Sequence, residues 1–167
     1  MNSKMFVPLR AIISQELAEL TSTVEVCHLR LERRAEFIAR HEEDILADSL
    51  AACLHSFYTG LESIFESIAN EVDGGVPRGD AWHKKLLLQM TAEIAEVRGP
   101  AISANSQERL EAFRAFRHLF RNLYTHKVNP ERIFQLAGEL HETWQLVLTD
   151  LQNFLNFLAG LDDVSNN

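Results

Sequence analysis

Apolar residues recur every three or four positions along almost the whole chain. This spacing matches the 3.6-residue period of an α-helix, and no segment of comparable length alternates with a period of two. The pattern therefore predicts an all-α protein. The expected helices cover residues 13–38, 46–72, 81–95, 105–123 and 130–158.

Glycine, proline and capping residues separate these helices. The strongest interruption is Asp73–Gly79, which contains three glycines and a proline, and Gly99-Pro100 ends the short third helix. Asn105 with Glu108 matches a capping box, and Asn129-Pro130-Glu131 is typical of an N-cap followed by a first turn. Four long helices, one short helix and short connections predict an antiparallel four-helix bundle with an additional short helix.

The composition is that of one globular domain. The chain has 167 residues, of which 46% are hydrophobic and 24% are charged. We expect a single domain over residues 1–161, followed by a frayed tail over 162–167. No apolar run approaches the roughly 20 residues of a membrane span, and no signal-peptide pattern opens the sequence. These features predict a cytoplasmic protein without membrane contact, in which Cys27 and Cys53 are buried free thiols.

The charge is unevenly distributed. The net charge is −8, which argues against general coating of nucleic acid. Between Arg109 and Arg132, however, there are six basic residues and two acidic ones, so this segment carries +4 and the remainder carries −12. This basic segment fits a phosphate-contacting surface. It fits equally well a solvated helix face whose cations lie near the helix C-terminus.

Several common catalytic signatures are missing from the sequence. There is no P-loop, GxGxxG, HExxH or GxSxG. A di-metal bundle site needs two Glu-x-x-His motifs, and the chain has one, at Glu25 and His28. We therefore expect no metal and no cofactor.

Arg121, Asn122 and His126 form an R-N-x3-H pattern near the predicted end of a helix, inside the basic segment. A guanidinium can grip a phosphate and stabilise charge that develops on it. An imidazole transfers protons near neutral pH, and an amide can orient either partner. Without metal ligands, this set suits RNA cleavage by attack of a 2′-hydroxyl on the adjacent phosphate. Arg–His pairs at this spacing also arise by chance.

Neighbouring residues are weaker candidates for the same site. Arg117, His118 and Tyr124 lie close to the motif in sequence and are expected to support it. Glu62 lies at helical spacing from Tyr58 and Glu66, so it is expected either to join a structural hydrogen-bond cluster or to orient Arg121. Both tryptophans, Trp82 and Trp144, are expected to anchor the core.

Three sequence blocks, together with the R-N-x3-H pattern, carry a resemblance to a known family. The blocks are Phe57–Glu66, Asp73–His83 and Phe116–Arg121, and the resemblance covers roughly residues 45–158. In these features the chain resembles the HEPN superfamily, whose motif is R-x(4–6)-H. Within it, the chain resembles the HepT-like ribonuclease toxins of prokaryotic toxin–antitoxin pairs.

The resemblance implies a four-helix HEPN bundle that forms a homodimer, with a metal-independent endoribonuclease site in the cleft between the two chains. It implies that Arg121 stabilises the phosphate, Asn122 orients, and His126 is the general acid/base. A nucleotidyltransferase antitoxin of the MNT type is the implied partner. Dimerisation is chemically reasonable, because one His takes a proton and its symmetry mate gives one.

The sequence departs from the family pattern at one position. HepT toxins carry a tyrosine two residues after the motif histidine, which the antitoxin modifies with AMP, whereas this chain has Val128 there. The resemblance therefore does not extend to modification at that position. Many close relatives lack a histidine at the position of His126. This leaves open an alternative, in which the chain is a non-catalytic HEPN module that binds a nucleotidyltransferase.

Overall fold

The computed structural model describes residues 5–120 and 128–164. These residues form six helices and no β-strand: α1 (Val7–Glu32), α2 (Arg34–Ala39), α3 (Glu43–Glu71), α4 (Trp82–Thr91), α5 (Ala104–Phe120) and α6 (Pro130–Val164). The predicted all-α class is confirmed.

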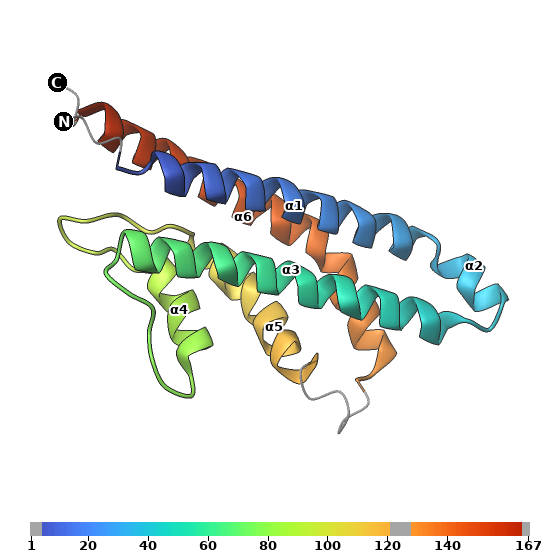
Figure 1. The fold of residues 1–167 in the computed structure, drawn as a ribbon. Helices are drawn as coiled ribbons and strands as arrows, with labels where there is room; N and C mark the ends of the chain where they lie inside the picture. Colours follow the sequence, from blue (N-terminus) through green and yellow to red (C-terminus); the bar gives the residue numbers. More distant parts are fainter. Residues whose placement is uncertain (1–4, 121–127, 165–167) are drawn as a thin grey trace.

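The four longer helices form the bundle. Helix α1 packs along both α3 and α6, and α5 packs against α3 and α6 (Figure 1). Helices α1 and α5 run in one direction, whereas α3 and α6 run in the other (Figure 1). This is the predicted antiparallel four-helix bundle. Helix α4 is the expected short helix, and it packs against α3 and α5.

The first predicted helix is broken into two. Helix α1 ends at Glu32, and the backbone N–H of Arg33 turns back to donate to the carbonyl of Arg30. Helix α2 contains no buried residue, and Ile38 is 48% exposed. The prediction of one helix through residue 38 is therefore wrong. The chain reverses direction into α3 here, through His41 in the left-handed region (φ 57°). Because no side chain of α2 is buried, packing against the bundle does not keep α2 in line with α1.

Aromatic side chains fill the centre of the bundle. Trp144 is 1% exposed and meets Phe57 edge-on, with ring centroids 5.8 Å apart. Phe57 also packs edge-on against Phe113 from α5. The indole Nε1 of Trp144 donates to Thr21 Oγ1 at 3.2 Å, so its one polar atom has a partner. The prediction that Trp144 anchors the core is confirmed.

A buried ion pair fixes the two long loops that flank α4. Arg98 Nε and Nη2 donate to the two carboxylate oxygens of Asp73 at 2.6 and 2.7 Å, and both side chains are almost fully buried. The remaining guanidinium hydrogens go to the carbonyls of Gln89, Ala92 and Gly99. Because every guanidinium N–H of Arg98 has an acceptor, the pair can be buried without leaving an unpaired charge. The glycine-rich interruption is thus held tightly beside α4.

The helix ends near residues 103 and 162 differ from expectation. Helix α5 begins at Ala104, and Ser103 caps it by accepting from the N–H of Ser106 at 3.2 Å, so Asn105 is not the cap. At the other end, α6 continues through Val164. Asp162 Oδ1 accepts from the Phe6 N–H at 2.9 Å, which ties this turn to the start of α1. The domain limit at residue 161 stays a prediction.

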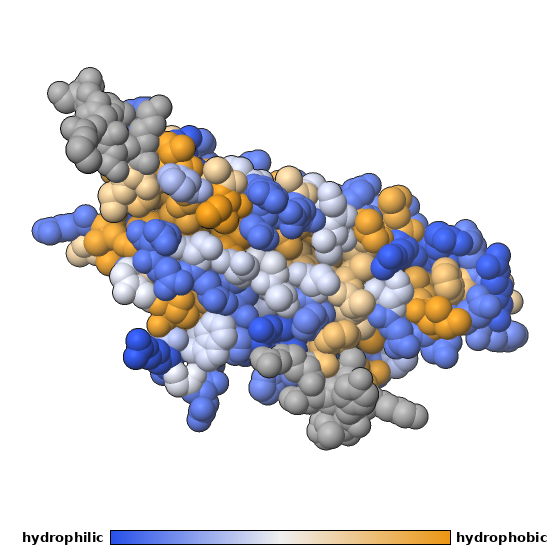
Figure 2. Space-filling model, in the orientation of Figure 1, coloured by the Kyte–Doolittle hydropathy of each residue, from blue (hydrophilic) through white to orange (hydrophobic). Residues whose placement is uncertain are grey.

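The surface in Figure 2 is mostly polar, with apolar side chains gathered near the first turns of α1 and near α2. Exposed apolar residues there are Met5, Val7, Ile12, Ile38 and Ile45. Among the described residues, no helix is long and apolar enough to cross a membrane.

Candidate functional site

Three ionisable side chains from three different helices meet beside the C-terminal end of α5. Glu62 from α3 lies between His83, in the first turn of α4, and Arg117, in the last turn of α5. The Glu62 Oε2 atom is 2.6 Å from His83 Nδ1, and Glu62 Oε1 is 3.0 Å from Arg117 Nη2. We call Glu62, His83 and Arg117 the Glu–His–Arg cluster.

The edge and the face of the His83 imidazole make different contacts. Nδ1 faces Glu62, so in a neutral His83 the proton would sit on Nδ1, toward the carboxylate, and Nε2 would carry none. Arg117 Nη1 lies 3.3 Å from Nδ1 and 3.1 Å from Nε2. Similar distances to both nitrogens place the guanidinium against the ring face. The Trp82 ring also stacks on His83, with centroids 3.6 Å apart.

Burial strengthens these contacts. The side chain of Glu62 is 3% exposed, whereas Arg117 and His83 keep 13% and 16%. Tyr58 lies nearby, and its burial together with the negative charge of Glu62 raises its pKa. Arg117 Nε is buried without a hydrogen-bond partner within the described ranges. The cluster is therefore largely sheltered from water, with His83 and Arg117 on its more accessible side.

This arrangement can hold and transfer a proton. A carboxylate that fixes a histidine tautomer and leaves Nε2 unprotonated is a known way to make a general base. Arg117 adds positive charge beside it, but Glu62 already neutralises much of that charge. The cluster is thus better suited to orienting α5 and to proton transfer than to gripping a phosphate by itself.

The sequence predicts only parts of this cluster. Arg117 is predicted as a supporting residue, and Glu62 is predicted either to join a hydrogen-bond cluster or to orient Arg121. No role is predicted for His83. The three residues lie 21 and 34 positions apart, so no local spacing joins them. The usable signal in the sequence is Glu62 itself, because it is a glutamate on the otherwise apolar face of a predicted helix.

The central predicted residues, Arg121, Asn122 and His126, lie outside the described residues, as does Tyr124. Helix α5 as described ends at Phe120, immediately before Arg121. His118 is exposed on the last turn of α5. The roles predicted for these side chains stay predictions.

Three arginines of the basic segment, Arg109, Arg114 and Arg117, are each paired with a carboxylate. Arg109 Nη2 lies 2.9 Å from Glu142, and Arg114 binds Glu111 with two hydrogen bonds of 2.6 and 2.9 Å. The hydrogen bond from Arg114 holds the pKa of Glu111 below its usual range. The segment is therefore less positive toward a ligand than its sequence implies.

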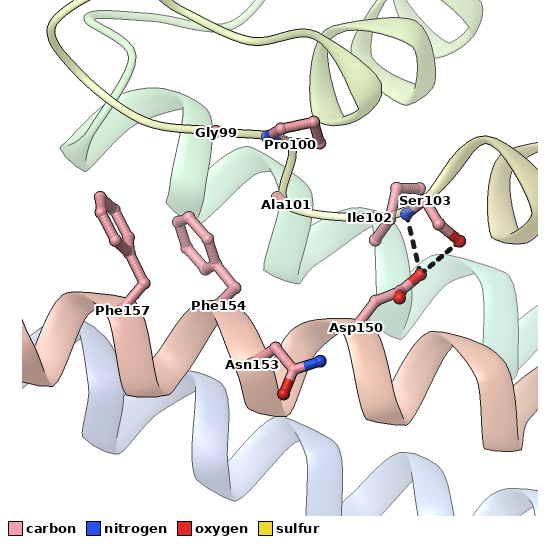
Figure 3. A pocket seen from close by; sticks show the side chains of 9 residues that line it. All are labelled: Gly99, Pro100, Ala101, Ile102, Ser103, Asp150, Asn153, Phe154 and Phe157. Carbon is pink, nitrogen blue, oxygen red and sulfur yellow. Dashed lines mark hydrogen bonds between the residues drawn. The ribbon is translucent and has the colours of Figure 1, made fainter.

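A separate surface pocket of about 450 Å³ lies between α6 and the loop before α5 (Figure 3). The rings of Phe154 and Phe157 point toward the loop, and the lining is mainly apolar. Its one carboxylate, Asp150, accepts hydrogen bonds from Ser103 N and Oγ, both at 2.8 Å. That carboxylate holds the start of α5 in place, since the same oxygen also accepts from Ser106 Oγ at 2.6 Å.

No group of three or more His, Cys, Asp or Glu residues with metal-binding geometry occurs within residues 5–120 and 128–164. A family model described as HepT-like protein matches residues 49–158, a span that contains the whole Glu–His–Arg cluster. No curated protein and no solved structure matches the chain.

Proposed function

The chain belongs to the HepT-like protein family, and we propose that it is a metal-independent endoribonuclease toxin of a toxin–antitoxin pair that acts as a homodimer. The observation that carries this proposal is the position of the Glu–His–Arg cluster. It holds the last turn of α5 directly ahead of the Arg121–Asn122–x3–His126 motif.

The proposed reaction needs a base, an acid and a cation. His126 of one chain removes the proton from a ribose 2′-hydroxyl, and the 2′-oxygen attacks the adjacent phosphorus. The bond from phosphorus to the 5′-oxygen breaks, and the symmetry-related His126 protonates that oxygen. Arg121 stabilises the charge on the phosphoryl oxygens, and Asn122 orients either partner. The products are a 2′,3′-cyclic phosphate and a free 5′-hydroxyl.

Arg117 acts in this scheme as a positioning residue. Its guanidinium is held by Glu62 at 3.0 Å and lies on the His83 ring, which ties α5 to both α3 and α4. Arg121 follows four residues later in the sequence. Misplacement of a catalytic group by about 1 Å can cost about 100-fold in rate, so fixing this helix end matters for catalysis.

A second function is favoured by one observation. Arg109, Arg114 and Arg117 are each paired with a carboxylate, which reduces the charge available to an RNA backbone. This fits a non-catalytic HEPN module that binds a nucleotidyltransferase partner. In that case the purified chain binds its partner without cleaving RNA.

The deciding experiment compares RNA cleavage by the wild type, Arg121→Ala and His126→Ala. We expect both variants to lose cleavage with unchanged helix content, and we expect EDTA to have no effect. Arg109→Ala, which removes an α5 arginine that pairs with Glu142, is the matched control and should keep activity. Cleavage that survives both motif substitutions in nuclease-free protein would overturn the proposal. A wild type without cleavage or toxicity that binds a nucleotidyltransferase would favour the second function.

A further inference from the structure

The two cysteines of the chain face each other across the α1–α3 interface. The helices run antiparallel, and they pack tightly at Gly60, where an added Cβ would lie 2.8 Å from Leu20 Cδ2. Cys27 lies seven residues beyond Leu20 on α1, and Cys53 lies seven residues before Gly60 on α3. Seven residues are about two helical turns, so the same register places the two thiols opposite each other.

A cation stands beside one of these thiols. Arg30 Nη1 lies 3.2 Å from Cys53 Sγ, within hydrogen-bond distance of sulfur. Arg30 forms no ion pair with a carboxylate in the part of the chain that the structure describes, so its charge acts on the sulfur. A neighbouring guanidinium stabilises a thiolate relative to a thiol.

The two cysteines differ in access to solvent. Cys27 is fully buried, whereas Cys53 is 7% exposed. Cys53 lines a surface depression of about 330 Å³ between α1 and α3, and Arg30 and Ser56 lie on its walls. A small reagent can therefore approach Cys53 from solvent, with Cys27 behind it.

The electrostatics of the pair agree with this geometry. The hydrogen bond from Cys27, followed by the charge and hydrogen bond of Arg30, lowers the pKa of Cys53 to about 6. The pKa of Cys27 is raised, mainly by the same hydrogen bond and by burial. One thiolate with a protonated neighbour is the arrangement of an attacking and a resolving cysteine.

We propose that Cys53 and Cys27 form a thiol oxidation site for small hydroperoxides, with Cys53 as the attacking and Cys27 as the resolving residue. The Cys53 thiolate attacks one peroxide oxygen, the O–O bond breaks, and hydroxide or alkoxide leaves with a proton from solvent. Cys53 becomes a sulfenic acid. The Cys27 sulfur then attacks Cys53 Sγ, the S–O bond breaks, and the leaving hydroxide takes the Cys27 proton as water. The peroxide is reduced, and the two thiols become a disulfide that links α1 to α3.

The first test is alkylation of the folded protein by iodoacetamide, read for each cysteine by peptide mass spectrometry. We expect Cys53 to react first, with a rate midpoint near pH 6, and Cys27 to react only after unfolding. Arg30→Met should slow Cys53 labelling by about tenfold near neutral pH. Arg33→Met, which removes an exposed arginine that pairs with Glu36, is the control and should change nothing. A Cys53 midpoint near the ordinary value of about 8.5, or no effect of Arg30→Met, would overturn the proposal.

The second test uses hydrogen peroxide. The wild type should lose two hydrogen atoms and yield a Cys27–Cys53 linked peptide without reductant. Cys27→Ala should instead accumulate a sulfenic acid at Cys53 that dimedone traps. A wild type that forms neither product while Cys53 remains a free thiol would contradict the proposal. Neither test depends on ribonuclease activity, so this inference and the proposed function fail or succeed separately.

Discussion

Glu62 Oε2 and His83 Nδ1 lie 2.6 Å apart, and the other oxygen of the same carboxylate holds Arg117 at 3.0 Å. One buried charge thereby joins α3, α4 and α5 at the point where α5 approaches the candidate catalytic motif. The carboxylate contacts an imidazole nitrogen with one oxygen and a guanidinium with the other, so it fixes the three helices relative to one another.

Removing the charge of Glu62 should destabilise the fold. Glu62→Gln keeps the size of the side chain but leaves Arg117 without its counter-ion in a poorly hydrated site. We expect a loss of about 3 kcal/mol in the free energy of unfolding, measured by urea denaturation. Glu25→Gln, at an exposed position on α1, should change stability by less than about 0.5 kcal/mol. If Glu62→Gln lowers the free energy of unfolding by no more than Glu25→Gln does, the cluster contributes no stability.

Arg117→Lys should test positioning in the proposed ribonuclease. Lysine keeps the charge but cannot contact Glu62 and His83 together as a planar guanidinium does. We expect kcat for RNA cleavage to fall about tenfold with KM unchanged, since the reacting groups are misplaced while RNA binding persists. Arg114→Lys, which alters an arginine paired with Glu111, should leave both constants unchanged. If kcat stays at the wild-type value while the protein is folded, Arg117 has no positioning role.

The Asp73–Arg98 pair should behave as a coupled unit. Asp73→Asn or Arg98→Met alone leaves a buried charge unpaired, and each should cost about 3–5 kcal/mol. The double variant should cost less than the sum of the two, which a double-mutant cycle in urea will measure. The exposed pair Arg33–Glu36 is the control, with a coupling energy of about 0.5 kcal/mol or less. Additive losses at residues 73 and 98 would refute the coupling.

Gly60 and Gly160 should respond in opposite directions to alanine. At the half-buried Gly60 the new Cβ would lie 2.8 Å from Cδ2 of the buried Leu20, and displacing that side chain should cost about 1–3 kcal/mol. Gly160 has no neighbour within 4 Å of its Cβ position on α6. There the gain in helix propensity should stabilise the protein by about 0.5–1 kcal/mol. Thermal denaturation measures both, and stabilisation by Gly60→Ala would disprove close α1–α3 packing.

The Glu111–Arg114 pair should make a small pH-dependent contribution to stability. The folded-state pKa of Glu111 is lowered, so its contribution is complete above the usual value near 4.5 and is lost as the pH falls through the folded pKa. Glu111→Gln should therefore cost about 0.5 kcal/mol at neutral pH, because the pair is partly exposed, and less near pH 4. Urea denaturation at both pH values tests this, with Glu108→Gln as control. A cost that does not shrink on acidification would contradict this assignment.

The sequence by itself determined which segments are helical, because helix formation is local and an apolar stripe with a 3.6-residue period can be buried only as a helix. The same reasoning located the interruption at Asp73–Gly79 and the start of α6 at Pro130. It missed the break at Arg33, since the apolar pattern continues through Ile38 although the bundle no longer covers that side.

Only the tertiary structure decided which charges meet. Glu62, His83 and Arg117 belong to three helices and come together through the packing of α3, α4 and α5, so their spacing in the sequence has no period to detect. Likewise, the sequence shows two isolated cysteines, whereas antiparallel packing places Cys27 opposite Cys53 and Arg30 beside it. Local periodicity encodes helices, but long-range packing sets the distances on which ionisable groups and thiols depend.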